Sequence, residues 1–531
     1  MPTLEWIGKD KVINHHLEVP YRVLEHQYTY IGNRQTEEEI TDGNKIIRGD
    51  NLEALKALLP QYEGKIKCIY IDPPYNTGNE GWVYNDNVND PKIKKWLGEV
   101  VGREGEDLSR HDKWLCMMYP RLKLLQRLLA DAGAIFISID DAELANLRLI
   151  CDEIFGANNF IDTVIWEKRY SPQNAVQWFS ESHDFIIVYA KNKEQWHPNL
   201  LNRTDEMNAR YRNLDNDPRG IWKPTDSTAQ AGHGTDSQFY VLTAPNGKEH
   251  NLPNGRCWVY TKEVMNRMIA ENRVWFGNSG NNMPAIKRFL SDVKKGMSCK
   301  TIWPYQEVGH NQEAKKEIKA IFPESIPFDT PKPTRLMERI LHISTDPNSI
   351  ILDSFAGSGT TAHAVLNMNK ADGGNRKFIL VEMLDYVENI TAERMRRVID
   401  GYGEGKAAEE GTGGSFGFYE LGEPLLNTDQ TLNERIPAEK IRQYVFFMET
   451  KQPMGAPSEN EPYLLGCHIN TAYYFYYDKD RITTLNYEFL SSVQTQAEGY
   501  VIYADLCALC DGELKQYGIT FKKIPRDISR L

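Results

Sequence analysis

The tetrapeptide Asp72-Pro73-Pro74-Tyr75 directly follows an apolar run over residues 67–71. It places a carboxylate, two rigid carbonyls and an aromatic ring at the end of an expected strand. Asp72 and the Pro73 carbonyl can each accept one hydrogen of an amine, while Tyr75 can stack on a planar ring. The prolines hold φ near about −65°, so the loop is stiff before a substrate arrives. The motif predicts a pocket for a planar base with an exocyclic amine; an isolated match is also typical of a tight turn.

A second motif lies far downstream, where a strand expected over residues 350–353 runs into Ser354-Phe355-Ala356-Gly357-Ser358-Gly359-Thr360-Thr361. The glycines Gly357 and Gly359 let a ligand approach the backbone, and the helix that follows offers free N–H groups and the Thr360 hydroxyl. Asp353 is placed to orient this loop, which also contains Phe355 and Ala356. We predict a nucleotide-type cofactor loop. A dinucleotide fingerprint would need glycine at Ala362.

Together the two motifs resemble those of the amino-methyltransferases of DNA, which pair a D/N/S-P-P-Y/F/W catalytic motif with an F-x-G-x-G cofactor motif. The catalytic motif comes first here, which is the family's β arrangement. Asp72 matches the residue that adenine-N6 enzymes usually carry, whereas cytosine-N4 enzymes more often begin with Ser. The resemblance implies methyl transfer from S-adenosylmethionine to adenine N6 in duplex DNA, with S-adenosylhomocysteine as product. The base would have to swing out of the stack to reach such a pocket.

The resemblance also implies roles for three further residues of the cofactor pocket. Glu382 ends the next strand, where the family's acidic residue binds two ribose hydroxyls; a generic acid at a strand end is the alternative. Asp50 matches the position near the cofactor's adenine amine and equally fits a helix cap. Lys332 lies in a Lys-Pro segment that lines the cofactor pocket in the family, although Pro331 stands where the family usually has Gln.

Contacts to DNA are expected in two places. In a turn-rich insert, Arg273, Lys287 and Arg288 supply positive charge beside Trp275, a mixture suited to phosphate and groove contacts. A solvated helix face over residues 284–295 is the alternative. Trp82 and Tyr84, which follow the catalytic motif, are candidates for stacking or for filling the gap that an extruded base leaves; packing on a neighbouring segment is the alternative.

Within the β group, the chain resembles the modification subunit of a Type III restriction-modification system. The features are the extended Ile71-Asp72-Pro73-Pro74-Tyr75-Asn76-Thr77-Gly78, the later Tyr84-Asn85-Asp86, and the block Arg273-Val274-Trp275-Phe276-Gly277. This resemblance covers about residues 45–400 and implies a homodimer and a helicase-nuclease partner. The chain itself has no G-x-x-x-x-G-K-[S/T] ATPase loop, so cutting would require another chain.

Other function classes stay open at this point. A solitary or Type II-like adenine methyltransferase and a cytosine-N4 methyltransferase would share every motif. An RNA or protein amine methyltransferase would favour Asn in place of Asp72 and would not need the long insert. A catalytically silent DNA-binding subunit would lack a complete cofactor loop.

The motifs require a sheet that brings distant strand ends together. Alternating strand and helix signals from Lys45 onward predict an α/β fold, with the Rossmann-like parallel sheet that the resemblance implies. Strands on both sides of the insert are needed to complete one sheet. We therefore expect an N-terminal arm (1–44), a split catalytic domain (45–195 and 305–400), a target-recognition insert (196–304), a linker or exposed hairpin (401–420) and a small C-terminal α/β domain (421–531).

The composition is that of a globular protein: of 531 residues, 41% are hydrophobic and 26% are charged. A net charge of −12 excludes a uniformly basic coat but allows local DNA-binding patches. The eight cysteines are scattered, and Cys507 and Cys510, the close pair, lack further ligands, so we predict no metal site. No targeting pattern begins the chain, and no apolar run approaches the roughly 20 residues that span a bilayer. We expect a cytoplasmic protein without a membrane partner.

Overall fold

The structure is a computed structural model that describes residues 3–77, 95, 98–100, 109–173, 175–293, 296–324, 328–405, 408–427, 429, 431–456, 458–525 and 527–528. Trp82 and Tyr84, predicted to contact DNA, lie outside the described residues. The chain forms two compact units, one made of Met1–Asn199 with Lys300–Leu531 and the other of Leu200–Cys299.

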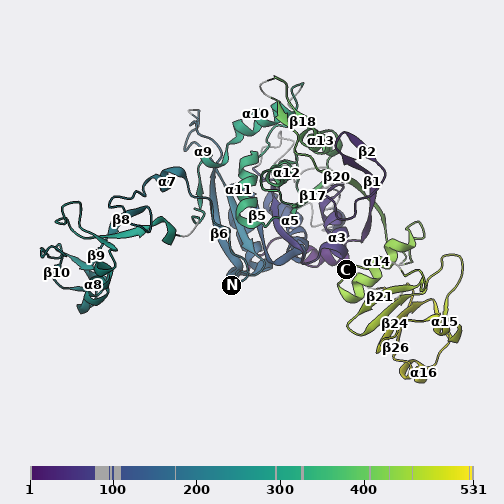
Figure 1. Cartoon of the computed structure of the whole chain (residues 1–531). Coiled ribbons are helices and arrows are strands. Elements are labelled where there is room, and N and C mark those ends of the chain that lie inside the picture. Colours follow the sequence, from purple (N-terminus) through teal and green to yellow (C-terminus); the bar gives the residue numbers. More distant parts are fainter. Residues whose placement is uncertain are drawn as a thin grey trace. The chain divides into compact units, whose positions relative to one another are not determined.

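A mixed sheet forms the centre of the first unit (Figure 1). Among the described residues it has eleven strands in the order β15-β6-β7-β5-β4-β16-β17-β3-β20-β1-β2. In chain order these strands are β1 (Arg22–Ile31), β2 (Arg34–Thr36), β3 (Lys45–Arg48), β4 (Ile66–Ile71), β5 (Leu129–Ile139), β6 (Phe160–Glu167), β7 (His183–Ala190), β15 (Ile302–Trp303), β16 (Ile350–Asp353), β17 (Lys377–Glu382) and β20 (Ser415–Pro424).

The middle of this sheet is parallel. Strands β5, β4, β16, β17 and β3 all run in one direction, and β7 is antiparallel to β5. Their residues are almost all buried, as expected for strands covered by helices on both faces. From β4 the chain continues to β5 on one side, whereas from β16 it continues to β17 on the other. The carboxyl ends of β4 and β16 therefore flank a topological switch point, where ligands bind in such α/β sheets. The fold is Rossmann-like.

Helices connect these strands and pack on them. The helices of this region are α1 (Lys9–Val12), α2 (His15–Glu18), α3 (Asn51–Tyr62), α5 (Arg110–Leu128), α6 (Leu144–Cys151), α9 (Tyr305–Val308), α10 (Asn311–Ile321), α11 (Thr334–Ser344), α12 (Thr360–Asp372) and α13 (Glu393–Asp400). Helix α5 begins with a capping box in which Ser109 and Asp112 bond to each other's backbone N–H, which fixes the start of this helix.

Two segments differ from the sequence-based expectation. Residues 1–44 were predicted to be an arm, yet β1 pairs with β20 in the sheet. Residues 401–420 were predicted to be a linker or hairpin. The short strands β18 (Gly401–Tyr402) and β19 (Glu409–Glu410) do pair, but the segment ends in β20, which lies parallel to β3. Strands β1 and β20 thus stabilise each other although they lie hundreds of residues apart in sequence, and Tyr28 of β1 stacks on Phe418 of β20.

The C-terminal part contains α14 (Ala438–Thr450), which packs on the main core, followed by a four-stranded sheet. Its strands, in the order of the sheet, are β21 (Leu464–His468), β22 (Thr471–Phe475), β24 (Gly499–Ala504) and β26 (Ile519–Lys523). Two short helices accompany them, α15 (Tyr487–Ser492) and α16 (Asp511–Gln516), and β23 (Thr484–Leu485) pairs with β25 (Leu506–Cys507). Within the described part of the chain, none of the helices has the length and apolar character that a membrane crossing requires.

The second unit has its own small core around Trp258, Met265 and Phe276. Its elements are α7 (Asp205–Ala209), β8 (Trp222–Asp226), β9 (Thr228–Gln230), β10 (Leu242–Thr243), β11 (Glu249–His250), β12 (Arg256–Trp258), α8 (Lys262–Ala270), β13 (Val274–Trp275) and β14 (Ala285–Phe289). Strand β14 pairs with both β13 and β8. It occupies part of the segment for which a solvated helix face was the alternative, and its Ile286 packs into this core.

Candidate active site

The catalytic and cofactor motifs meet at the switch point of the sheet. Asp72 follows β4, the glycine loop follows β16, and both line one cavity of about 30 Å³. The residues around it are Tyr70, Asp72, Phe328, Thr330, Pro331, Lys332, Met337, Asp353, Phe355, Ala356, Gly357, Ser358, Thr360 and Thr361. Because β4 and β16 are neighbours in the sheet, two motifs nearly 300 residues apart in sequence come into contact with the same space.

Both carboxylate oxygens of Asp72 have a partner. The Tyr75 hydroxyl donates to Oδ1 at 2.9 Å, and the Lys332 ammonium donates to Oδ2 at 2.5 Å. The side chains of Lys332 and Asp72 are only 9% and 15% exposed. The ammonium also lies 5.3 Å from the centroid of the Tyr75 ring and 6.0 Å from that of Trp166. Lys332, predicted among the cofactor-binding residues, therefore contacts the catalytic motif directly.

The Pro74 carbonyl is occupied by a neighbour that sequence reasoning missed. Trp114 Nε1 donates to it at 2.6 Å, and Trp114 is completely buried in α5. No described residue donates a hydrogen bond to the Pro73 carbonyl. Of the two proline carbonyls, the one predicted to accept an amine hydrogen is thus the one that no described residue occupies.

A buried carboxylate holds the turn that follows Tyr75. Glu143 has no exposed surface and accepts hydrogen bonds from Asn76 Nδ2 and from His111 Nδ1, the latter at 2.7 Å. Asn76 has a φ of 59°, in the left-handed region that few side chains adopt without local hydrogen bonds. Its amide also donates to the Arg110 carbonyl at 3.2 Å. These contacts fix the exit of the catalytic loop against α5 and α6.

The glycine loop adopts a conformation suited to a close ligand. Gly357 and Gly359 have φ of 52° and 79°, and a Cβ on Gly357 would meet the Phe328 ring at 3.1 Å. Glu382 accepts hydrogen bonds from the N–H groups of Gly357 and Met383, both at 2.9 Å. The carboxylate at the end of β17 therefore holds the loop in place. Its predicted contact with ribose hydroxyls remains a prediction.

A buried arginine of α13, Arg394, contacts the glycine loop and the start of α12. Arg394 Nη1 donates to the hydroxyls of Thr360 and Ser358 at 2.9 and 3.0 Å. Burial lowers the pKa of this guanidinium to about 10. Arg394 was not predicted from the sequence, because it lies on α13 in a run of charged residues that reads as a solvated surface. It fixes the Thr360 hydroxyl from behind the loop.

Asp353 is completely enclosed at the base of the cavity. Burial, together with the charges of Asp72 and Glu382, raises its pKa to about 7, while hydrogen bonds from the Thr361 hydroxyl and the Phe355 N–H oppose this rise. Those bonds measure 2.6 and 3.1 Å. Asp353 orients the loop through a backbone N–H, as its position in the sequence predicts.

Asp50 acts as a helix cap in this structure. Its Oδ1 accepts hydrogen bonds from the N–H groups of Leu52 and Glu53, in the first turn of α3. Its other oxygen lies 3.2 Å from Arg121 Nη2, on α5. The cap predicted as an alternative is present, and the contact to a cofactor adenine remains a prediction.

The DNA-contact residues predicted in the insert have different environments. Lys287 is a correction: its side chain is fully buried and forms ion pairs with Asp215 and Asp217, so it cannot reach a phosphate. The alternation of β14 turns Lys287 inward and leaves Arg288 exposed. Arg273 is half-buried and pairs with Asp292 at 3.0 Å. Trp275 packs edge-on against Trp222, with ring centroids 5.5 Å apart.

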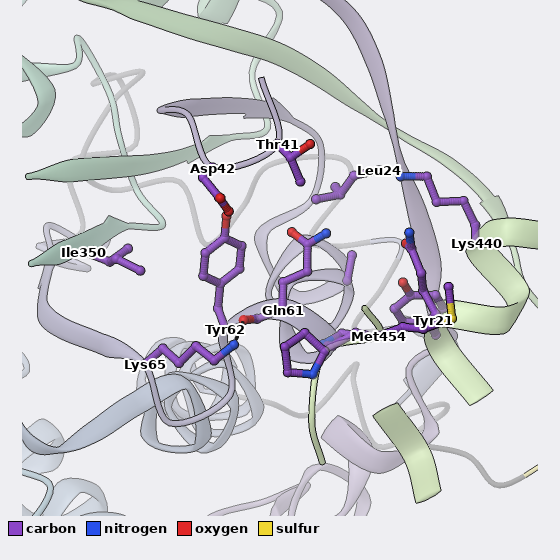
Figure 2. Close-up of a pocket in the computed structure, with 14 residues that line it drawn as sticks. Tyr21, Leu24, Thr41, Asp42, Gln61, Tyr62, Lys65, Ile350, Lys440 and Met454 are labelled. Atoms are coloured by element: carbon purple, nitrogen blue, oxygen red, sulfur yellow. Dashed lines mark hydrogen bonds between the residues drawn. The ribbon is translucent and has the colours of Figure 1, made fainter. Parts of the chain in front are cut away.

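A larger cavity of about 340 Å³ lies away from these motifs (Figure 2). Tyr21, Tyr62 and Lys65 line it, together with Ile350, the first residue of β16. It therefore opens at the amino end of β16, whereas Asp353 and the glycine loop lie at the carboxyl end. Neither Asp72 nor a residue of the glycine loop contributes to its walls. It is not the site that the two motifs form.

Comparison with known proteins agrees with these motifs. A family model described as DNA methylase (N6_N4_Mtase) matches residues 66–393. The Type III restriction-modification enzyme StyLTI Mod subunit of Salmonella typhimurium is 36% identical over 66% of this chain and 53% of its own length. The Type III restriction-modification enzyme EcoP15I Mod subunit of Escherichia coli is 32% identical over 72% of this chain and 64% of its own length. The Type II methyltransferase M.KpnI of Klebsiella pneumoniae is 31% identical over 64% of this chain and 80% of its own length. The chain thus spans between about half and two thirds of the length of these Mod subunits.

Proposed function

Because the chain belongs to the N6_N4_Mtase family of DNA methylases, we propose that it transfers a methyl group from S-adenosylmethionine to N6 of an adenine at a specific site in duplex DNA. The observation that carries this proposal is the single cavity lined by Asp72 and by the loop around Gly357. A methyltransferase needs an acceptor site and a donor site that share one space, and this chain forms both.

The residues at the switch point fit the cofactor. The left-handed glycines allow close approach, and the first N–H groups of α12 would bind the carboxylate of the cofactor's amino-acid end. Glu382 would supply acceptors for its ribose hydroxyls, and Asp353 at the base of the cavity would accept a hydrogen bond from its ammonium. When bound, S-adenosylmethionine supplies an electrophilic methyl group on a sulfonium that leaves as a neutral thioether.

The catalytic loop prepares the acceptor. An adenine amine is a weak nucleophile because its lone pair is delocalised into the ring. Asp72 and the Pro73 carbonyl accept its two hydrogens and hold the lone pair toward the methyl group, while Tyr75 lies against the base. Asp72 takes up the proton after attack. Since the amine of a paired adenine lies inside the duplex, the base must leave the stack to reach this loop.

We further propose that the chain serves as the modification subunit of a Type III restriction-modification system. It would act as a homodimer alongside a helicase-nuclease restriction subunit. The identity to two Type III Mod subunits supports this assignment. A Type II-like enzyme without such a partner is the second candidate, since the match to M.KpnI covers 80% of that protein's length. A cytosine-N4 target is the alternative for the base.

The test is methyl transfer with tritium-labelled S-adenosylmethionine and unmethylated duplex DNA, followed by nucleoside mass spectrometry. We expect label in N6-methyladenine. N4-methylcytosine would overturn the choice of base, and label in RNA or protein alone would overturn the substrate class. Copurification of a helicase-nuclease chain with the native protein separates a Type III subunit from a solitary enzyme.

A further inference from the structure

The loop between β6 and β7 carries two adjacent aromatic side chains that contact almost nothing. Trp178 is 83% exposed and Phe179 is 93% exposed. Single exposed apolar residues are common on protein surfaces. Two large adjacent aromatic side chains exposed to solvent are instead typical of a surface that contacts a partner. No described residue makes a ring contact with either side chain.

The base of this loop is held beside the catalytic motif. Strand β7 is antiparallel to β5, and β6 is antiparallel to β7, so β6 runs in the same direction as β4 and β5. The loop after β6 therefore leaves the sheet at the carboxyl ends of these strands, where Asp72 follows β4. Trp166, near the end of β6, lies next to the Lys332 ammonium that pairs with Asp72. Lys168 pairs with Asp184 at 2.5 Å across the two strands. The loop therefore starts from the wall of the acceptor site.

Two hydrogen bonds join the two sides of this loop. The N–H of Arg169 donates to the Ser182 carbonyl at 3.2 Å, and the N–H of Gln173 donates to Ser180 Oγ at 2.7 Å. Trp178 and Phe179 directly precede Ser180, whose hydroxyl accepts the second of these bonds. Their high exposure shows that neither ring is folded onto the sheet.

A helix with three exposed lysines, α10, adjoins the same loop. The Asn311 N–H, which begins α10, donates to the Lys168 carbonyl at 3.1 Å. Tyr170 packs on Tyr305 and on His310, with ring centroids 5.5 and 5.4 Å apart. Figure 1 shows α9 and α10 at the end of β6. Lys315, Lys316 and Lys319 lie on the exposed face of α10, and none of them forms an ion pair with a described residue.

We infer that this loop and α10 form a DNA-contact surface beside the acceptor pocket, in which Trp178 and Phe179 stack on bases at the gap left by the target base. The α10 lysines bind backbone phosphates. Stacking aromatics beside a positively charged track are the chemistry that recognises an opened strand. A protein partner would need an apolar patch with a polar rim, whereas the loop that carries these rings is bonded at its base to the start of a helix with three exposed lysines. The inference rests on the proposed DNA methylation.

The experiment compares the wild-type protein with the Trp178→Ala/Phe179→Ala variant on two substrates. One is a short duplex that carries the site found by modification sequencing, and the other is the same duplex with an abasic position opposite the target. On the paired duplex we expect kcat/KM to fall by roughly ten- to a hundredfold, which corresponds to the loss of stacking on one base. On the abasic duplex, where the target is already unpaired, the variant should recover to within about threefold of wild type.

Controls separate this inference from the proposed function. Tyr517→Ala removes an exposed aromatic of the C-terminal part and should leave both substrates unaffected. Equal loss on both substrates would show a structural role, and wild-type rates for the double variant on the paired duplex would overturn the inference; each result leaves methylation itself intact. If the wild-type protein methylates no DNA, the proposed function fails instead. Loss of binding to another protein without loss of methylation would assign the rings to a protein partner.

The lysines have a separate readout. The Lys315→Gln/Lys316→Gln/Lys319→Gln variant should bind duplex DNA with a shallower dependence of log Kd on log salt, by about 0.9 for each phosphate contact that is lost. An unchanged slope would remove α10 from the DNA-contact surface. Lys370→Gln, on the far end of α12 and already paired with Glu410, is the matched control.

Discussion

The ammonium of Lys332 lies 2.5 Å from Oδ2 of Asp72, although the two residues are 260 positions apart in sequence. This ion pair joins the segment before α11 to the catalytic loop. It also places a cation between the rings of Tyr75 and Trp166, on the acceptor side of the site. Lys332 therefore belongs with the acceptor residues of the site as much as with its cofactor residues.

The ion pair makes Lys332 a positioning residue for Asp72. Lys332→Met leaves a nearly buried carboxylate without its partner, so we expect the free energy of unfolding to fall by about 3–5 kcal/mol. In the Lys332→Met/Asp72→Asn variant, which has no unpaired charge, much of this loss should be recovered. Urea denaturation of the four proteins of this cycle measures the coupling. Additive losses would show that the two side chains do not interact.

Glu143 should control the rate without affecting the cofactor. In Glu143→Gln, an amide replaces the carboxylate that accepts hydrogen bonds from Asn76 and His111. We expect the catalytic loop to shift and kcat to fall by roughly ten- to a hundredfold, with unchanged affinity for S-adenosylmethionine. Single-turnover kinetics and calorimetry report the two quantities. Glu63→Gln, which removes a distant partner of Arg127, is the control, and an equal effect of both variants would contradict the role of Glu143.

The motifs were predictable because their chemistry is local. Asp72-Pro73-Pro74-Tyr75 and the glycine loop each follow a short apolar run, and a strand end that meets small or rigid residues is visible in the sequence. The β3–β4–β5 and β16–β17 alternation was predictable for the same reason. The strand at 415–424 was not, because its pairing with β1 and β3 depends on residues about 400 positions away.

The missed site residues depend on tertiary contacts in the same way. Glu143 directly precedes α6 and Arg394 lies on α13, both in charged sequence, and nothing in their neighbours indicates complete burial. Lys287 was predicted to face DNA because positive charge beside Trp275 is typical of a binding surface. Asp215 and Asp217, some 70 residues earlier, make it a buried structural residue instead.

That correction is testable in the second unit. Lys287→Met removes the cation that pairs with the buried Asp217 and the partly buried Asp215, so we expect this unit to lose about 3–5 kcal/mol of stability. Limited proteolysis should then cut within residues 200–299 at a lower temperature than in the wild-type protein. Arg288→Met, at the exposed neighbouring position, should change stability by no more than about 0.5 kcal/mol. Equal resistance of both variants would contradict the burial of Lys287.

Asp353 should make stability depend on pH. Its pKa of about 7 in the folded protein lies above its ordinary value of 3.8, so between these values the folded state holds a proton that the unfolded chain has released. This contribution therefore makes stability fall as pH rises from about 4 to about 7. Asp353→Asn removes the titration, and its free energy of unfolding should decline less over this range. Urea denaturation at both ends of the range measures the difference; identical pH dependence in the two proteins would contradict a protonated Asp353.

The most direct measurement pairs cofactor binding with methyl transfer in Asp72→Ala, after its melting temperature has shown that the variant is folded. The account predicts that affinity for S-adenosylmethionine stays within about threefold of wild type, because the glycine loop is intact, while methylation of duplex DNA falls by roughly 10²–10⁴-fold. Methylation at the wild-type rate would contradict it.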